Sequence, residues 1–292
     1  MNTVLKAFLL KTTRIIPDEL YLRIAYRMVT GKTLHLNPPV TYNEKLQWLK
    51  LNNRKDQYTS MVDKYEVRKF IEERIGGRYL IPTLGVWNKP EDIDFDSLPD
   101  EFVLKCTHDC GGLVICKDKS KLDCDAAKKQ LAECLKHNFY YQGREWPYKN
   151  VKPRIYAEKY MSNPNEEQLS DYKVFCFNGV PKIIQVDYDR YTRHKRQFFD
   201  TEWNRIDVSF HFLSDTKKQI VKPSVLDEML ELSKKLSAGF PHLRTDFYII
   251  GNKLYVGEMT FFHGTGFGRW WPESFDAEMG TWLDLSNVNV TK

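Results

Sequence analysis

The sequence predicts an α+β fold, with a helical region at the N-terminus, a small unit of helices and strands, and a larger, mainly antiparallel unit. Apolar residues recur at helical spacing up to the Gly76-Gly77 pair, and from Arg78 they alternate with a period of two, as in half-buried strands. Asn178-Gly179 and Gly251-Asn252 each stand between two alternating runs, which is typical of a β-hairpin. The chain of 292 residues is long enough for two or three packed subdomains.

The N-terminal region is expected to hold four helices. Residues 2–30 form two short helices separated at Pro17, because proline cannot continue a helix. Asn43 is expected to cap a helix over residues 44–54, and a further helix runs from Asp63 to the Gly76-Gly77 stop. The first of these segments is apolar and basic without a cleavage site, so two roles stay open for it: packing against the protein, or lying on a membrane surface.

The later elements follow from the change of period at Arg78. They are a strand at 78–87, an acidic loop at 91–101, strands at 102–106 and 113–118, a helix at 121–141, a strand at 154–161, a hairpin at 171–190, a basic run at 191–200, a helix at 224–237 and a hairpin from 242.

Composition limits the class of protein. With 42% hydrophobic and 28% charged residues the chain is globular and not disordered. The net charge of +5 is interspersed, which argues against a nucleic-acid partner and is compatible with an anionic substrate or a membrane surface. The six cysteines form no CxxC pair, and no stretch of the sequence is apolar enough for a membrane span, so a cytoplasmic protein with reduced thiols is expected.

The last hairpin carries the strongest candidate for a metal site. Side chains alternate along a strand, so Arg244 and Asp246 share one face, as do Glu258 and Thr260. A two-residue turn would place Asp246 opposite Gly257, whereas a three-residue turn would place it opposite Glu258. The second register would set two carboxylates beside an arginine, which suits Mg²⁺ facing a phosphate. The alternative is an ordinary set of ion pairs on a solvated face.

A second candidate site lies on the strand that ends at Cys106. Lys105 precedes the glycine pair Gly111-Gly112, and a strand lysine beside a glycine loop can hold phosphate with its charge while loop N–H groups cap the oxygens. The loop does not match the Walker A pattern.

Taken in order, these motifs resemble the ATP-grasp superfamily over about residues 63–268. The pieces are Lys64, Lys105, the run Glu158-Lys159-Tyr160-Met161, Lys173, Arg244 with Asp246, and Glu258 with Thr260. The resemblance implies two α+β lobes that clasp ATP behind an N-terminal helical extension. The implied boundaries are 1–62 for the extension, 63–157 for the small lobe and 158–292 for the large lobe with the metal hairpin.

The resemblance also implies the roles of particular residues, with ATP and Mg²⁺ as cofactors. The implied nucleotide-binding residues are Lys64, Lys105, His108, Gly111, Gly112, Glu158, Lys159, Tyr160, Met161 and Lys173. The implied metal ligands are Asp246, Glu258 and Thr260, although the family commonly has asparagine where this chain has Thr260. Arg244 and Lys173 are implied to stabilise charge during the reaction, and His263 is a candidate for the general base.

The motifs are similar to the ATP-grasp branch related to teichuronopeptide synthesis. That resemblance implies a ligase that joins an amino acid or small amine to a uronic acid carboxyl group, through an acylphosphate, during capsule or surface-polysaccharide synthesis. It would act in the cytoplasm, or at the inner face of the membrane through the N-terminal helix. A basic cluster is a candidate site for the anionic acceptor and comprises Arg190, Arg193, His194 and Arg196.

Two other functions stay open at this stage. A glycosyltransferase often carries a DxD metal motif, and Asp94 to Asp96 and Asp187 to Asp189 match that short pattern. A nucleotide-binding subunit without catalytic activity is the third reading, because Thr260 stands at a ligand position.

Overall fold

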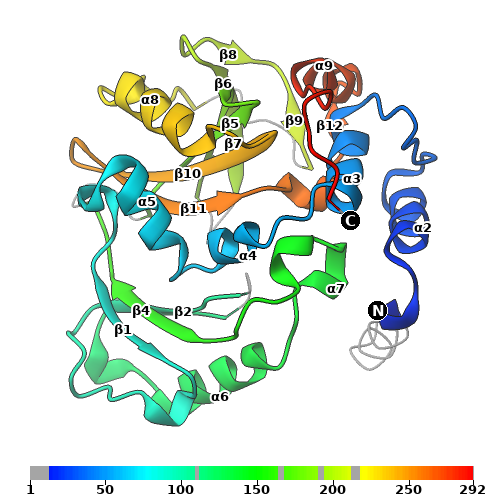
Figure 1. Ribbon diagram of the computed structural model, residues 1–292. Coiled ribbons are helices and arrows are strands. Elements are labelled where there is room, and N and C mark those ends of the chain that lie inside the picture. The colour runs from blue at the N-terminus through cyan, green and yellow to red at the C-terminus, as the bar shows by residue number, and fades with distance from the viewer. Residues whose placement is uncertain (1–12, 109–111, 164–167, 190–193, 212–217, 292) are drawn as a thin grey trace.

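The computed structural model describes residues 13–108, 112–163, 168–189, 194–211 and 218–291, and it has two antiparallel sheets facing each other (Figure 1). The helices are α2 (Asp18–Thr30), α3 (Tyr42–Asn52), α4 (Gln57–Val62), α5 (Val67–Ile75), α6 (Cys124–Leu135), α7 (Tyr140–Gly143), α8 (Leu226–Ser237) and α9 (Ser274–Trp282). Short 3₁₀ helices are η1 (Thr13–Ile15), η2 (Gly77–Tyr79), η3 (Pro90–Asp92), η4 (Lys119–Lys121), η5 (Trp146–Tyr148) and η6 (His263–Gly266).

The smaller sheet has four strands in the order β1-β4-β2-β3. Their bounds are β1 (Thr83–Trp87), β2 (Phe102–Cys106), β3 (Leu113–Cys116) and β4 (Ile155–Lys159). One face of this sheet packs on α6 through a separate apolar core that includes Leu104, Leu131 and Ile155, all fully buried. The other face points toward the larger sheet, as Figure 1 shows.

The larger sheet has six strands in the order β11-β10-β5-β6-β7-β8. Their bounds are β5 (Asp171–Phe177), β6 (Val180–Tyr188), β7 (Lys195–Asp200), β8 (Arg205–Ile206), β10 (His242–Ile250) and β11 (Lys253–Thr260), and a separate pair is β9 (Ser209–Phe210) with β12 (Trp270–Trp271). Because side chains alternate, the Cys176 face packs under α8, where its thiol contacts the Ser233 carbonyl. The opposite face carries Lys173 and Asp246, which point toward the smaller sheet.

The N-terminal region packs against the larger unit. Helix α3 lies against α9 and against η6, which directly follows β11. Its cap is Thr41 and not the predicted Asn43: the Thr41 side chain accepts from the Glu44 N–H, and Glu44 accepts from the Thr41 N–H in return. Asn43 instead reaches across the interface, where its side chain donates to the Gly268 carbonyl at 2.8 Å and its N–H donates to Asp276.

Other predicted elements differ in their ends. The helix expected over 121–141 is two helices, α6 and α7, since α6 ends at Leu135 and the chain turns before Tyr140. The helix expected from Asp63 begins at Val67, because the Asp63 carboxylate accepts N–H groups of a preceding turn. Helices α4 and α9 and the short pair β9 and β12 were not predicted. The Asn178-Gly179 turn is confirmed, with both residues at positive φ.

We predict that Gly280→Ala in α9 destabilises the protein by about 1–3 kcal/mol. A Cβ atom at this position would lie 2.2 Å from the backbone carbonyl oxygen of Val40, which cannot rotate away. Urea unfolding followed by circular dichroism measures the change. Ala277→Ser, at an exposed position of the same helix, is the control and should leave stability within about 0.5 kcal/mol of the wild type. Equal stability of both variants would contradict the close contact between Gly280 and the Val40 carbonyl oxygen.

Candidate active site

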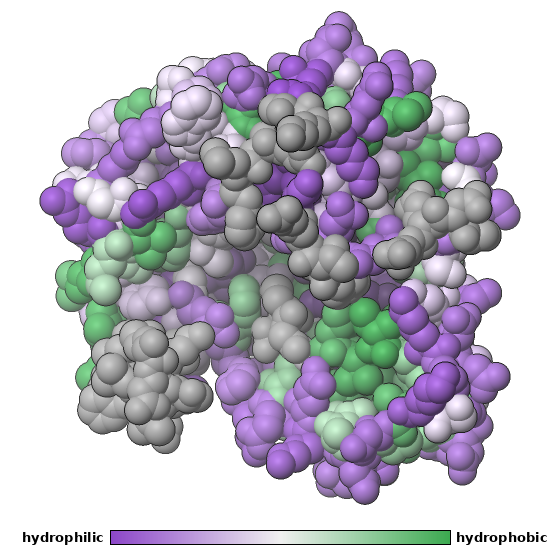
Figure 2. Space-filling model, turned by 180° about the vertical axis from the view of Figure 1, so that it is seen from behind, coloured by the Kyte–Doolittle hydropathy of each residue, from purple (hydrophilic) through white to green (hydrophobic). Residues whose placement is uncertain are grey.

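A cleft of about 1330 Å³ lies between the two sheets. Figure 2 shows it as the hollow across the middle of the molecule, with apolar side chains on its lower wall. The smaller unit contributes residues that include Ile81, Val103, Lys105, Gly112, Ile115, Glu158, Lys159, Tyr160 and Met161. The larger unit contributes Lys173, Gln185, Asp187, Arg196, Arg244, Asp246, Tyr248, Glu258 and His263, among others. Residues distant in sequence thus meet in one space.

The register of β10 and β11 results from a β-bulge. Of the two turns left open by the sequence, the two-residue turn is the one that forms, since Ile250 pairs with Lys253. The register shifts by one at Gly257, and Asp246 therefore lies opposite Glu258 as expected for a metal site. A Cβ atom at Gly257 would lie 2.7 Å from the Tyr248 ring, so only glycine fits beside that ring as it now lies.

The centre of the larger wall is a buried charge cluster. Arg244 donates to both oxygens of Asp246, at 2.7 and 2.8 Å, and the Lys173 ammonium lies 2.6 Å from the same carboxylate. Burial alone would raise the pKa of Asp246, but the charges of Arg244 and Lys173 outweigh burial and lower it. The same carboxylate raises the pKa of Arg244 against the effect of burial. Asp246 and Arg244 are therefore both charged at neutral pH.

Glu258 is the accessible carboxylate of the hairpin, with its side chain 32% exposed. Its oxygens lie 4.0 Å from the Lys64 ammonium and 3.8 Å from Arg244, beyond direct hydrogen-bond distance. Asp246 and Glu258 on paired positions of one face form a hard-oxygen donor set that fits Mg²⁺. The described residues contain no group of three or more His, Cys, Asp or Glu suited to a metal, so a cation here would complete its shell with phosphate and water oxygens.

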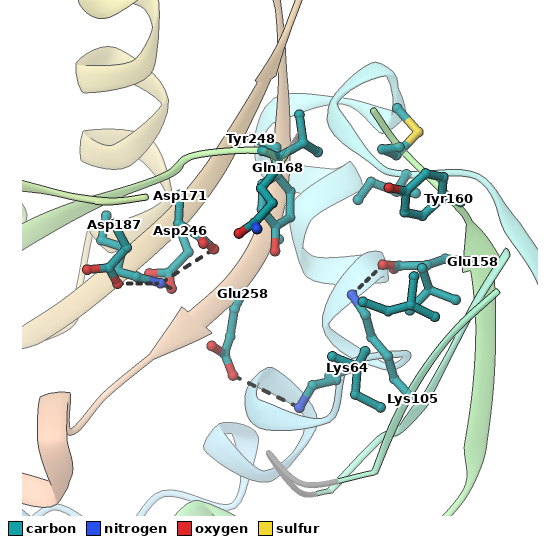
Figure 3. A pocket seen from close by; sticks show the side chains of 18 of the residues that line it. Lys64, Lys105, Glu158, Tyr160, Gln168, Asp171, Asp187, Asp246, Tyr248 and Glu258 are labelled. Atoms are coloured by element: carbon teal, nitrogen blue, oxygen red, sulfur yellow. Dashed lines mark hydrogen bonds and ion pairs between the residues drawn. The ribbon is translucent and has the colours of Figure 1, made fainter. Parts of the chain in front are cut away.

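The opposite wall presents Lys105 near the end of β2. Its ammonium pairs with Glu158, which lies on β4 next to β2 (Figure 3). Directly after Glu158 the chain leaves β4 through Tyr160 and Met161, both of which line the cleft. Apolar side chains cover the wall around them, including Ile81, Val103 and Ile115. This wall thus offers a charged end and an apolar end, as a nucleotide requires.

Four cleft residues lie on β5, β6 and β7 and extend the charge cluster: Asp171, Gln185, Asp187 and Arg196. The Lys173 ammonium lies 3.6 Å from Asp171 and 3.8 Å from Asp187, and Arg196 Nε lies 3.2 Å from Asp187. Sequence reasoning gave no cleft role to Asp171 or Gln185, and it considered Asp187 only in a DxD pattern. The available signal was polar residues at alternate positions of otherwise apolar strands.

His263 forms a hydrogen bond with the Arg244 guanidinium. Its Nδ1 accepts from the arginine Nη1 at 2.7 Å, which leaves the ring proton on Nε2. Burial first, and then the neighbouring charge of Arg244, lower the pKa of His263 well below its usual value. The ring is therefore neutral at physiological pH and its Nδ1 lone pair is already in use. This arrangement favours a positioning role, and the general-base role remains an untested prediction.

Several predicted residues lie elsewhere. Thr260 accepts from Arg244 at 3.1 Å and is not among the residues that line the cleft, so its role as a third metal ligand stays a prediction. His108 is buried and its Nε2 lies 3.1 Å from the His137 carbonyl oxygen. The Asp94 carboxylate accepts backbone N–H groups in its own loop, outside the cleft lining. The predicted residues that fall outside the described part are Gly111, Arg190 and Arg193.

Comparison with known proteins gives the family. Residues 44–284, most of the chain, match the family described as TupA-like ATPgrasp. The chain belongs to the TupA-like ATP-grasp family. The match includes both sheets and every cleft residue named above, so the predicted ATP-grasp fold is confirmed for this TupA-like protein.

Solved structures resemble the TupA-like chain more distantly. D-alanine–D-alanine ligase from Bacillus anthracis, complexed with ATP, is 14% identical with a TM-score of 0.40, over 82% of this chain and 62% of that one. The corresponding ligase from Helicobacter pylori is 14% identical at 0.38, over 84% and 64%. Biotin carboxylase from Campylobacter jejuni is 14% identical at 0.41, over 69% and 40%. The chain thus spans less than two thirds of each enzyme. No curated protein matches the sequence.

We predict that the free energy of unfolding falls as the pH drops from 7 to 5, in part because of the buried His242 at the start of β10. Its Nδ1 donates to the Phe261 carbonyl and its Nε2 accepts from Tyr42, and burial lowers its pKa to about 4. The unfolded chain therefore binds the proton first, and the loss at pH 5 is on the order of 2 kcal/mol for this residue.

Urea unfolding at pH 7 and pH 5 measures this dependence. His242→Gln should flatten it, whereas His35→Gln, at an exposed position, should leave it unchanged. A pH dependence that is identical in the two variants would contradict the assignment.

Proposed function

We propose that this protein is an ATP-dependent carboxylate–amine ligase and that ATP binds in the cleft between the two sheets. The observation that carries the proposal is the pairing of Asp246 with Glu258 across the bulged hairpin, facing Lys105 and Lys64. Membership of the TupA-like ATP-grasp family supports the same reaction class. The two carboxylates could bind the metal of a metal-bound triphosphate, and the two lysines opposite them could bind its phosphate oxygens.

In the proposed complex the adenine lies on the apolar end of the smaller wall, beside the Glu158-to-Met161 segment. The Lys105 ammonium, now paired with Glu158, and the Lys64 ammonium would turn toward the phosphate oxygens. Gly112 lines the cleft and packs closely on the core of the smaller unit, because a Cβ here would clash with the sulfur atoms of Cys106 and Cys134. These residues orient the nucleotide and leave its terminal phosphate near Arg244.

Asp246 and Glu258 would hold Mg²⁺, which when bound neutralises phosphate charge during transfer. Arg244 is fixed by Asp246 and His263, so its guanidinium is already aligned before the substrates arrive. Lys173 is fixed by the same Asp246 carboxylate. Such preorganised cations stabilise the charge that develops on the transferred phosphoryl group without further reorganisation.

The proposed reaction has two steps. A substrate carboxylate oxygen attacks the γ-phosphorus of ATP, the bond to the β-phosphate oxygen breaks, and an acylphosphate and ADP form. An amine then attacks the acyl carbon, the bond between that carbon and the phosphate oxygen breaks, and an amide, phosphate and a proton result. The cleft residues hold the reactants in line and exclude water from the acylphosphate.

The carboxylate substrate would bind at the end of the cleft formed by Arg196, Phe210 and His211. Arg196 is held by the Phe210 carbonyl at 3.0 Å and by Asp187, so its guanidinium is fixed. A fixed arginine suits a carboxylate, and aromatic rings suit the faces of a sugar. We propose a uronic acid unit as this substrate, with an amino acid or small amine as its partner, in surface-polysaccharide synthesis on the cytoplasmic side of the membrane.

We predict that Asp246→Asn and Glu258→Gln each lower ADP release by at least about 100-fold, because the Mg²⁺ that binds the phosphates loses a charged ligand. The assay supplies Mg²⁺-ATP with amino acids or small amines and with free or nucleotide-linked uronic acids, and mass spectrometry identifies the products. Glu231→Gln, an exposed glutamate on α8, is the matched control.

ADP formed only when both substrates are present, with a product lighter than their sum by one water, is the expected result. Sugar transfer from a nucleotide donor with ATP unchanged would favour the glycosyltransferase instead. ATP binding without turnover would favour a non-catalytic subunit. Unimpaired ADP release by both variants would refute the metal site.

We predict that Arg196→Gln raises the KM for the carboxylate substrate by about tenfold or more and leaves the KM for ATP within about threefold. Arg196 lies on β7 of the larger wall, whereas the adenine is assigned to the smaller wall, so the loss of Arg196 should affect the carboxylate substrate more than ATP. Arg205→Gln, on the neighbouring strand β8, is the control, because Arg205 is exposed and does not line the cleft. Equal changes in both KM values would contradict a specific acceptor role.

A further inference from the structure

Helix α2 has an apolar stripe on its outer face. Leu20, Ile24 and Met28 follow one another at intervals of four, so they lie on one side of the helix, and they are 51%, 46% and 78% exposed. The opposite side of the helix is buried through Leu22 and Tyr26, which pack with Phe267. The helix therefore has two apolar sides, of which the described part of the protein covers one.

The exposed stripe continues onto β12. Arg269 donates to the Val29 carbonyl at the end of α2, and Lys32 pairs with Glu273 at 2.9 Å, so the two segments are joined on both sides of Trp271. Trp270 is buried and Trp271 alternates outward, with 64% of its surface exposed. A large aromatic side chain thus stands beside the end of the apolar stripe.

The rim of this face is basic. Its exposed acidic side chains are Glu19 and Glu273. Its exposed basic side chains are more numerous and comprise Arg14, Arg23, Arg27, Lys32 and Arg269. Both carboxylates are already paired, with Arg23 and Lys32 respectively. The surface around the stripe is therefore electropositive.

We propose that the face formed by α2 and Trp271 docks on an anionic lipid bilayer. An apolar stripe with arginine and lysine at its edges and tryptophan beside it matches a helix that lies in the plane of the membrane interface. In Figure 2 apolar side chains gather along the left edge, where α2 lies, and the cleft opens on the adjoining face. The helices of the described part are too short or too polar to span a bilayer, so contact is confined to the surface.

Charge favours a bilayer over a second copy of the chain. In a two-fold dimer through α2 the arginines of one copy would approach those of the other, and like charges would repel. An anionic headgroup layer instead attracts the net positive charge of the rim. The proposal concerns a surface outside the cleft and does not depend on the ligase activity.

Sedimentation of the full chain with sucrose-loaded vesicles tests the proposal. Vesicles of phosphatidylcholine with 30% phosphatidylglycerol, an amount on the order of that in anionic membranes, should bind the protein. Vesicles of phosphatidylcholine alone should bind it at least about tenfold less, and added salt should weaken binding. The triple variant Leu20→Gln, Ile24→Gln and Met28→Gln should lower partitioning by about tenfold or more.

A matched control changes Val180→Gln and Val221→Gln, which are exposed apolar residues on other surfaces, and should bind as the wild type does. A second variant, Arg14→Gln with Arg27→Gln, should remove much of the preference for anionic lipid and retain the fold by circular dichroism. Binding by the triple variant equal to that of the wild type would overturn the proposal. So would no wild-type binding to anionic vesicles, or a dimer in solution that the triple variant abolishes.

Discussion

The Asp246 carboxylate lies between two buried cations, and the arrangement of the cleft depends on that contact. Arg244 and Lys173 come from neighbouring strands, and without the carboxylate each would lose its nearest counter-charge in a poorly solvated place. Asp171, Asp187 and Arg196 extend the cluster, so its positive and negative charges balance. A buried ion cluster of this kind contributes little net stability, but it fixes each side chain in one orientation.

The two walls of the cleft differ in how firmly their charged groups are held. On the larger wall, Arg244 has three partners of its own and its position is set by β10, β11 and η6. On the smaller wall, Lys105 pairs with Glu158, and this pair would open in the proposed complex, where Lys105 turns toward the phosphates. The larger wall is thus suited to the chemical step, and the smaller wall to binding and release of the nucleotide.

Sequence reasoning predicted the parts of the fold that local patterns control. The Asn178-Gly179 turn and strand β2 followed from turn chemistry and from alternation, and the ATP-grasp family followed from the order of short motifs. The cap of α3 was missed because Thr41 and Glu44 form a reciprocal pair that outcompetes Asn43. Asp171 and Gln185 were missed because polar residues at alternate positions of β5 and β6 were the only local signal, and it is the sheet order β10-β5-β6 that brings them into the cleft.

The bulge at Gly257 separates two properties that a simple hairpin would couple. In a regular hairpin, the turn length alone determines which side chains face each other. An insertion of one residue at the tip would therefore exchange the two faces of the strand. Here an extra residue inside β11 sets the facing pair close to the cleft, and the tip at Gly251-Asn252 lies five residues after Asp246 and six residues before Glu258. Related chains could therefore vary in the tip, by substitution or by paired insertions, and keep the carboxylates in place. Divergence within this hairpin should accumulate at its tip and spare the glycine.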